Sequence, residues 1–334
     1  MLKTRNFWVT FGIGAALIAG VAQAHADDKM TLTLNFLAQP AQAGFFLAKE
    51  KGYYKDVGID LTIIEGKGSS TTAQITAAGQ NDVGFVNGSI VLSFINKGAP
   101  LKIIAEPIQG NFMSLGFLTS TNIKKPDDLI GKTIAVCPGC AQIPMLKAML
   151  AKANIPESKV KIINVDQSAH VSMLEEHKID AAAGDPNSVS IEMAHRGDKV
   201  SDMFFQDWGI KLVNFVLAAR DDKLKANPDL YKRFVAASLR GWHDVMTHQD
   251  EAIAALQHQY PEIKLDHATL LTQLKVGIAP FICVNDSPGV GKASKAMWES
   301  TYDVMEKYMG FKPTVKLADT YTDEYLPATL PACH

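Results

Sequence analysis

The sequence predicts an α/β protein made of two lobes. Segments with the two-residue alternation of strands and segments with the spacing of amphipathic helices follow one another through the first two thirds of the chain, which is typical of mostly parallel sheets. The chain of 334 residues is long enough for two compact lobes, each with its own core. Extended segments at 114–120 and 212–219 are expected to carry the chain into the second lobe and back.

The first lobe is expected to begin with alternating strands and helices. Between Ile59 and Ile63, apolar and polar residues alternate as in a half-buried strand. Gly52 follows an apolar helix and is suited to ending it. The expected strands are 31–37, 59–63, 82–86 and 101–105, and the expected helices are 41–51, one that opens at 66–70 and runs to 78, and 89–96.

The second lobe continues the same pattern, and helices fill the rest of the chain. Its expected strands are 133–136, 160–165 and 180–183, and its expected helices are 144–153, 169–177 and one from the loop 184–187 to residue 195. Helices are then expected at 228–247, 250–259, 267–276 and 289–309. The predicted division is a signal peptide at 1–26, lobe one at 27–118 and 215–334, and lobe two at 119–214.

The first 26 residues have the composition of an export signal. Lys3 and Arg5 precede an apolar stretch at 7–21, and small residues at 22–24 or 24–26 fit a signal-peptidase site. About 15 apolar residues are fewer than the ~20 that span a bilayer, although an uncleaved tether is an alternative. We therefore expect a cleaved signal peptide and a protein that works in the periplasm.

Charge and motifs exclude several classes of protein. With 33 Lys plus Arg against 35 Asp plus Glu, the formal charge is −2, so no surface for nucleic acid is expected. No phosphate-binding loop, nucleophile elbow or zinc-binding helix is present, and the 9 histidines are scattered. We therefore expect no cofactor, no metal and no catalytic residues.

The four cysteines permit three pairings. Cys137 and Cys140 have the C-x-x-C spacing of redox and metal sites, so a local disulfide, two free thiols, a redox or metal site and a ligand-lining role are all open. A local bond there would leave Cys283 to pair with Cys333 and to hold the C-terminal tail, in a compartment where disulfides persist.

Several segments, in this order and at these spacings, resemble one known family. They are Gly44 to Tyr54 with Gly58-Ile59-Asp60, the small-residue helix 72–79 before 82–85, 97–102, 127–136, and 227–230 with the helix to 242. The chain resembles the periplasmic substrate-binding proteins of ABC-type importers, in the branch of receptors for thiamine-pyrimidine precursors, sulfonates, taurine and nitrate. The resemblance covers nearly all of the chain after the expected signal peptide.

This resemblance implies a fold, a motion and partners. The fold is the type II periplasmic binding protein fold, in which two α/β lobes joined by two extended crossings close on a ligand by hinge motion. The implied partners are a small-molecule ligand and the membrane permease subunits of an ABC importer.

Candidate ligand-binding residues lie in the loops that follow the expected strands. Ligands in such folds lie beyond the carboxyl ends of parallel strands, where helix N-termini present free N–H groups. Ser69, Ser89 and Asn187 are equally suited to capping helices, and Asp185 to shaping a turn. The candidates are Gln39, Gln42, Lys67, Ser69, Ser70, Asn87, Ser89, Cys140, Gln142, Asp185 and Asn187.

The chemistry of these loops favours a heteroaromatic ligand. They contain no arginine, Lys67 is their one fixed cation, and Asp185 would oppose an anion. Amide, hydroxyl and carboxyl groups supply both donors and acceptors for ring edges, as a thiamine-pyrimidine precursor needs. Trp208 and Trp242 could stack on such a ring or pack in the core.

Other interpretations of the ligand and of the class of protein remain open at this point. A sulfonate, taurine, nitrate or small carboxylate is the alternative ligand within the same fold. The alternatives of another class are an enzyme like fungal thiamine-pyrimidine synthase, whose dense cysteine cluster this chain lacks, and a redox or metal protein that uses Cys137 and Cys140.

Overall fold

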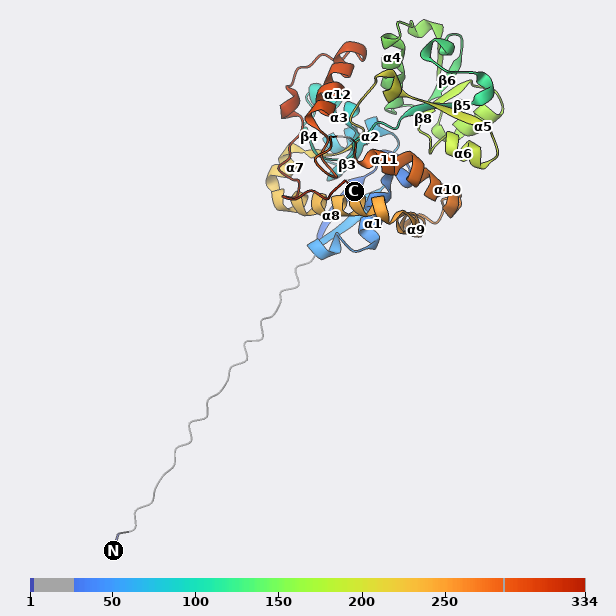
Figure 1. Ribbon diagram of the computed structural model, residues 1–334. Coiled ribbons are helices and arrows are strands. Elements are labelled where there is room, and N and C mark those ends of the chain that lie inside the picture. Colours follow the sequence, from blue (N-terminus) through green and yellow to red (C-terminus); the bar gives the residue numbers. More distant parts are fainter. Residues whose placement is uncertain (3–26, 285, 334) are drawn as a thin grey trace.

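The computed structural model describes residues 1–2, 27–284 and 286–333, and it contains two five-stranded sheets flanked by helices (Figure 1). The predicted signal peptide, apart from Met1 and Leu2, lies outside the described residues. In the part of the chain that is described, no helix has the length and apolar character needed to cross a membrane. The predicted α/β class with two lobes is confirmed.

The first sheet has the strand order β2-β1-β3-β10-β4. The strands are β1 (Asp28–Thr33), β2 (Ile59–Ile64), β3 (Val83–Asn87), β4 (Leu101–Ile108) and β10 (Phe215–Arg220). β1 pairs in parallel with β2 and β3, whereas β10 runs antiparallel between β3 and β4. Three helices connect the early strands: α1 (Ala43–Glu50), α2 (Ser69–Ala77) and α3 (Gly88–Asn96).

The second sheet repeats this plan with the order β7-β6-β8-β5-β9. The strands are β5 (Ser114–Leu118), β6 (Thr133–Val136), β7 (Lys161–Asn164), β8 (Ala181–Gly184) and β9 (Val200–Phe204), and the helices are α4 (Gln142–Lys152), α5 (His170–Glu175) and α6 (Ser190–His195). β5 runs antiparallel between β8 and β9. In each sheet four strands run in the same direction and one crossing strand, β10 or β5, runs against them. The prediction of mostly parallel strands is therefore confirmed.

The chain passes between the sheets twice. The expected boundary at residue 118 falls at the end of β5, but β5 pairs within the second sheet. β10 begins at Phe215 and pairs within the first sheet, next to the expected boundary at 214. We propose that the crossings are residues 109–113 and 209–214, so that β5 belongs to lobe two.

Helices dominate the remainder of the first lobe, as predicted. They are α7 (Asp221–Ala226), α8 (Pro228–Thr247), α9 (Gln249–Gln259), α10 (His267–Thr272), α11 (Ala279–Ile282) and α12 (Lys295–Tyr308). Pro228 opens α8 at a position where its missing N–H costs nothing. A π-helical segment, Gln273–Ile278, joins α10 to α11. α10 packs against α6, so this helical layer reaches the second lobe (Figure 1).

The structure differs from the prediction at the last helix and at β9. The helix expected at 289–309 begins only at Lys295, because Ser294 caps it by accepting from Met297 N–H, and Gly291 has a φ of +94° that a helix excludes. β9 was not predicted, because only Met203 of its five residues is fully buried and its sequence lacks clear alternation.

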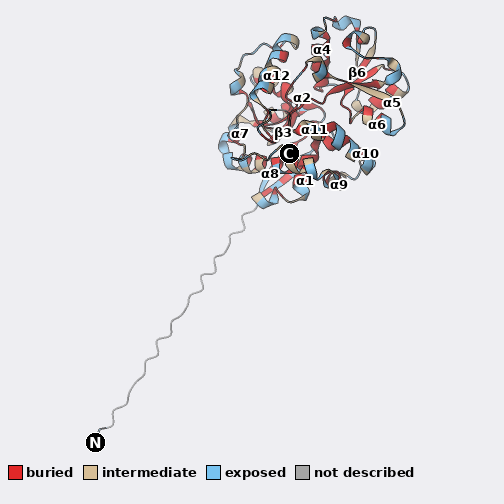
Figure 2. Cartoon of the chain, viewed as in Figure 1, coloured by how far each residue is buried: buried red, intermediate tan, exposed pale blue. Residues whose placement is uncertain are grey.

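Trp242 lies at the centre of the first lobe's core. Its ring packs edge-on against Phe45, with centroids 5.4 Å apart, and Phe85 lies beside both. Any side chain at Gly44 would overlap this indole, so the glycine lets α1 approach α8 closely. Trp242 is fully buried, and Trp208 is half-buried against the same core, so core packing is their role. Figure 2 shows buried residues concentrated in the interior of the two lobes and exposed residues along their outer edges.

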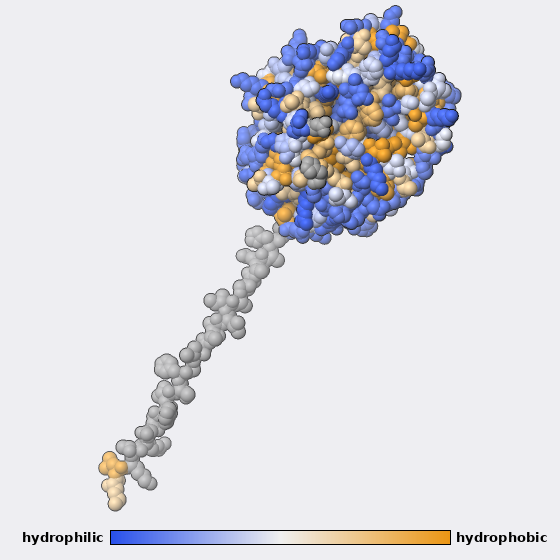
Figure 3. Space-filling model, viewed as in Figure 1, coloured by the Kyte–Doolittle hydropathy of each residue, from blue (hydrophilic) through white to orange (hydrophobic). Residues whose placement is uncertain are grey.

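The surface is mostly polar. Hydrophilic residues cover much of the face that Figure 3 shows. Within 27–284 and 286–333, the exposed large apolar side chains are Leu37, Ile64, Ile130 and Val276.

A disulfide joins the C-terminal tail to the helical layer. Cys283 and Cys333 are bonded across 50 residues of sequence, with their Cα atoms 5.8 Å apart. This pairing confirms the prediction from the sequence.

Candidate functional site

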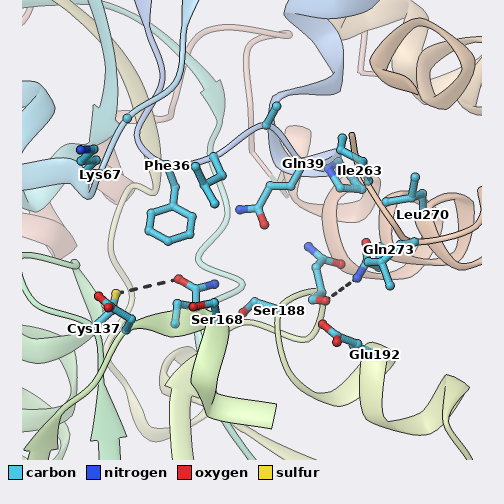
Figure 4. Close-up of a pocket in the computed structure, with 18 of the residues that line it drawn as sticks. Phe36, Gln39, Lys67, Cys137, Ser168, Ser188, Glu192, Ile263, Leu270 and Gln273 are labelled. Atoms are coloured by element: carbon cyan, nitrogen blue, oxygen red, sulfur yellow. Dashed lines mark hydrogen bonds between the residues drawn. The ribbon is translucent and has the colours of Figure 1, made fainter. Parts of the chain in front are cut away.

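A cavity of about 540 Å³ lies between the two lobes (Figure 4). Loops at the carboxyl ends of strands from both sheets line it, as the fold rule for parallel strands predicts. The helical layer forms the remaining wall with Ile263, Leu265, Leu270 and Gln273. We call this space the outer cavity; the residues that line it from the strand loops and α6 are 36–40, 66, 67, 137, 138, 166–168, 187, 188 and 192.

A narrower space, which we call the inner recess, continues from the outer cavity. Phe36, Gln39 and Gln167 line both spaces. The free volume of the recess is about 20 Å³, room for about one water molecule. The other residues that line it are Asn35, Ala41, Gly68, Ser69, Met113, Cys140, Ala141, Gln142, Asp185 and Phe215.

Phe36 gives the outer cavity an aromatic face. Figure 4 shows its ring beside the amide of Gln39, with Ser168 and Ser188 on the opposite wall. An aromatic ring surrounded by amide and hydroxyl groups suits a flat ligand whose edges carry hydrogen-bonding atoms.

The charges of the site are mainly acidic. Among the described residues that line the two spaces, Lys67 is the one lysine and no arginine is present. Asp166 and Glu192 line the outer cavity, and Asp185 lines the inner recess. An anionic ligand would therefore meet more carboxyl groups than cations.

Asp185 is a buried carboxyl group with a perturbed pKa. Its Oδ1 accepts hydrogen bonds from the backbone N–H groups of Asn187 (2.9 Å) and Ser188 (3.2 Å), which shapes the turn after β8. Burial raises the pKa of Asp185 to about 6, although these N–H groups oppose the shift. Near neutral pH this carboxyl can therefore take up a proton when a ligand favours it.

Asn187 lines the outer cavity, and its amide is buried and unsatisfied. The residue is 2% exposed, and neither Oδ1 nor Nδ2 has a hydrogen-bond partner among the described residues. Buried amides nearly always have partners, so a ligand group that reached this amide would remove a cost of about 1–3 kcal/mol.

The structure brings most of the candidate residues together. Gln39, Lys67 and Asn187 line the outer cavity, and Gln39 extends into the recess with Ser69, Cys140, Gln142 and Asp185.

The remaining candidates do not line either space. Gln42 is fully buried and donates from Nε2 to Asn35 Oδ1 (2.7 Å). Asn87 caps α3, because its Oδ1 accepts from the N–H (3.1 Å) and hydroxyl (2.8 Å) of Ser89. Ser70 donates its backbone N–H to the carbonyl of Gly139 in the other lobe (3.2 Å).

Several lining residues were not among the candidates. Phe36 lay inside the strand expected at 31–37, but β1 ends at Thr33 and Phe36 is in the following loop. Gln167 follows β7, so the rule of strand ends could have found it. Gln273 comes from the π-helical segment and donates to the carbonyl of Asn187, a contact that local sequence does not indicate.

Cys137 and Cys140 form a disulfide in the wall of the site. Their Cα atoms are 5.5 Å apart, Cys137 lines the outer cavity, and Cys140 lines the recess. Of the open alternatives for this pair, the structure shows the local disulfide, and both cysteines line the spaces between the lobes. In the described part of the chain, no three His, Cys, Asp or Glu side chains gather as a metal site.

A family comparison decides where this chain belongs. The NMT1/THI5-like family matches residues 39–252. The chain belongs to this family. The resemblance inferred from the sequence, to periplasmic substrate-binding proteins of ABC-type importers, is thereby confirmed.

Relatives of this chain include proteins named as small-molecule binding proteins and as synthases. The riboflavin-binding protein RibY of Chloroflexus aurantiacus is 24% identical, over 90% of this chain and 86% of its own. The formylaminopyrimidine-binding protein of Halalkalibacterium halodurans is 20% identical, over 89% of this chain and 90% of its own. A 4-amino-5-hydroxymethyl-2-methylpyrimidine phosphate synthase of Saccharomyces cerevisiae is 26% identical, over 64% of this chain and 65% of its own.

Solved structures show the same fold. The periplasmic aliphatic sulphonate binding protein SsuA of Escherichia coli has a TM-score of 0.67 at 14% identity, covering 91% of this chain and 94% of its own. The periplasmic nitrate-binding protein NrtA of Synechocystis also has a TM-score of 0.67 at 14% identity, and the match covers 90% of this chain and 87% of its own. The predicted periplasmic binding protein fold is therefore confirmed.

Proposed function

We propose that this protein is an extracytoplasmic receptor that binds a small heteroaromatic molecule of the thiamine-pyrimidine-precursor type. The ligand occupies the cavity between the lobes, and the loaded receptor delivers it to the permease subunits of an ABC importer. The observation that carries the proposal is the composition of the cavity, which combines one aromatic face, several amides, three carboxyl groups and a single lysine.

The proposed binding mode uses Phe36 for the ring face and the amides for the ring edge. An aminopyrimidine carries a ring nitrogen that accepts and an amino group that donates, and an amide side chain such as that of Gln39 can pair with both. The unsatisfied amide of Asn187 gains a partner in such a complex. Asp185 supplies an acceptor for an amino group, or binds a protonated ring nitrogen through its ionised form.

An anionic ligand is disfavoured by the same residues. Lys67 is exposed and is the one lysine among the described residues that line the two spaces, and these residues do not include an arginine, whose fork of donors suits a sulfonate or nitrate. A receptor for sulfonate, taurine, nitrate or a small carboxylate remains the second candidate, because solved proteins of this fold bear such names.

Export to the periplasm is part of the proposal. The charged and apolar pattern of residues 1–26 and the names of the relatives support it. The competing enzyme class is supported by the synthase relatives. In the present chain Cys137 is joined to Cys140 in the cavity wall. A test for turnover separates a receptor from an enzyme.

A thermal-shift panel tests the proposal. The protein without residues 1–26 is mixed with formylaminopyrimidine, riboflavin, taurine, an alkanesulfonate and nitrate in turn. A ligand at 100 times its dissociation constant adds about 2.7 kcal/mol to stability, so a heteroaromatic ligand should raise the melting temperature by several degrees. Mass spectrometry of the recovered ligand should show it unchanged.

Two results would overturn this function. Stabilisation by the sulfonate, taurine or nitrate, with none by the heteroaromatic compounds, would assign the protein to the anion receptors. Recovery of a chemically altered ligand would assign it to the enzymes.

A further inference from the structure

The Cys137–Cys140 disulfide borders the ligand space, and the proposed receptor function gives this bond no role. Cys137 lines the outer cavity (Figure 4), and Cys140 lines the inner recess. Their exposed fractions are 3% and 8%. The cavity is therefore the route by which a small reagent reaches the sulfur atoms.

The loop that this disulfide closes also connects the two lobes. The Gly139 carbonyl accepts a hydrogen bond from the backbone N–H of Ser70 (3.2 Å), which lies in the first turn of α2 in lobe one. Gly139 has a φ of +72°, a conformation that glycine adopts readily and other residues rarely do. The direction of its carbonyl, and so the contact between the lobes, depends on the conformation of residues 137–140.

The short spacing of Cys137 and Cys140 argues against a disulfide whose only role is to stabilise the fold. The bond joins residues 3 apart, whereas Cys283–Cys333 joins residues 50 apart. A disulfide that closes a short loop removes little entropy from the unfolded chain. Its main mechanical effect is local, on the loop that contacts Ser70.

Cys140 is placed to act as a leaving group. It lies just before α4, an 11-residue helix, and its carbonyl accepts from the N–H of Ile143. The N-terminus of a helix stabilises a thiolate, and a thiol with a lowered pKa leaves faster in disulfide exchange. Cys137 faces the larger space, so an attacking thiolate reaches its sulfur from the outer cavity.

We propose that Cys137–Cys140 is a redox-exchange site for small dithiols, and that its reduction releases the Gly139–Ser70 contact between the lobes. A thiolate of the dithiol attacks Cys137 Sγ and forms a mixed disulfide, while Cys140 leaves as a thiolate. The second thiol of the reagent then attacks the reagent's own sulfur in that mixed disulfide and releases Cys137. The protein gains two electrons and two protons, and the dithiol becomes a disulfide.

The test uses no solute, so its failure would leave the receptor function untouched. The variant Cys283→Ser/Cys333→Ser keeps only the Cys137–Cys140 bond and is treated with dithiothreitol while its circular dichroism is followed. Alkylation and mass spectrometry should find two thiols in protein that is still folded. Hydrogen exchange at the Ser70 amide should accelerate about tenfold, as expected for the loss of one hydrogen bond.

A matched amide and a second variant complete the design. The Thr72 amide, which bonds to Gly68 within lobe one, should keep its exchange rate. The variant Cys137→Ser/Cys140→Ser should show fast Ser70 exchange without any reductant. If the first variant fails to fold, peptide mapping of the reduced wild-type protein distinguishes the two pairs. Thiols that appear only on unfolding, or a Ser70 amide that exchanges equally in both redox states, would overturn the proposal.

Discussion

Asp185 shows how single residues can serve the fold and the site together. Its Oδ1 holds the turn after β8, and the residue also lines the inner recess. The sequence left open whether Asp185 shapes a turn or contacts the ligand. The structure shows the turn and places the residue where the proposed contact can form.

Asp185→Asn separates these two roles. Asparagine keeps an oxygen that accepts the backbone N–H bonds of Asn187 and Ser188, but it lacks the negative charge. We expect calorimetry to show affinity for the heteroaromatic ligand weakened by about 1–3 kcal/mol. The melting temperature should change little. Asp303→Asn, on the exposed face of α12, is the control, and equal affinity in the two variants would remove Asp185 from the site.

Glu106 makes the stability of the protein depend on pH. This carboxyl is buried in β4, its Oε2 accepts from the Ala293 N–H (3.0 Å), and burial raises its pKa to about 8. Because the folded-state pKa exceeds the unfolded value near 4.5, its stabilising effect is complete below that value and is lost as the pH rises toward 8.

Glu106→Gln should remove this pH dependence. Glutamine resembles the protonated acid and keeps the acceptor for Ala293. The wild-type free energy of unfolding should fall by an amount on the order of 4 kcal/mol more than that of the variant between pH 5 and pH 8. Urea unfolding at both pH values measures the difference. Parallel pH profiles for the two proteins would mean that Glu106 is ionised in the fold.

Among the elements, strands and their end loops were more predictable than helix contacts. Alternation located β2 and the loops after β1, β2, β6 and β8, because a strand's period shows directly in the sequence. The positions of β5 and β10 between other strands depend on pairing partners far away in the chain. The π-helical segment was part of the helix expected at 267–276, and nothing local indicates that it covers the cavity.

The candidate site was also predictable only in part. Gln39, Lys67 and Gln142 were found because they follow strands. Asn87 and Ser89 also lie at the end of a strand, but the Asn87 side chain accepts both bonds from Ser89 at the start of α3. Helix capping and ligand contact use the same residue types at the same positions, so the sequence alone does not separate them.

The π-helical segment provides the prediction at the scale of elements. Gly277 lies against Asn187, and a Cβ atom added there would overlap its Oδ1. Gly277→Ala should therefore push the helical layer away from lobe two. We expect a larger radius of gyration in X-ray scattering and at least about a tenfold loss of ligand affinity, since a part of the cavity wall moves.

Val276→Ala is the matched control for this experiment. Val276 is in the same segment and its side chain is 62% exposed, so its truncation leaves the contact with Asn187 intact. If Gly277→Ala has the same radius of gyration and the same ligand affinity as this control, the contact between the helical layer and lobe two does not govern binding.

At the scale of the whole molecule, contacts on several sides of the cavity join the lobes. The Ser70–Gly139 bond lies near the inner recess, and the Gln273–Asn187 bond lies at the outer cavity. On the surface, His195 Nε2 lies 3.1 Å from Asp266 Oδ2. An exposed pair of this kind contributes about 0–1 kcal/mol. The buried contacts at the cavity therefore matter more for how the lobes meet.

The central claim is that a heteroaromatic solute binds between the lobes, against Phe36. A crystal structure of the protein without residues 1–26, grown with the tightest ligand of the panel, tests it most directly. The account predicts a flat ring packed on Phe36, with its edge within 3.2 Å of the amides of Gln39 and Asn187. A ligand bound outside this cavity, or an anion held by Lys67 while Phe36 stays uncovered, would contradict it.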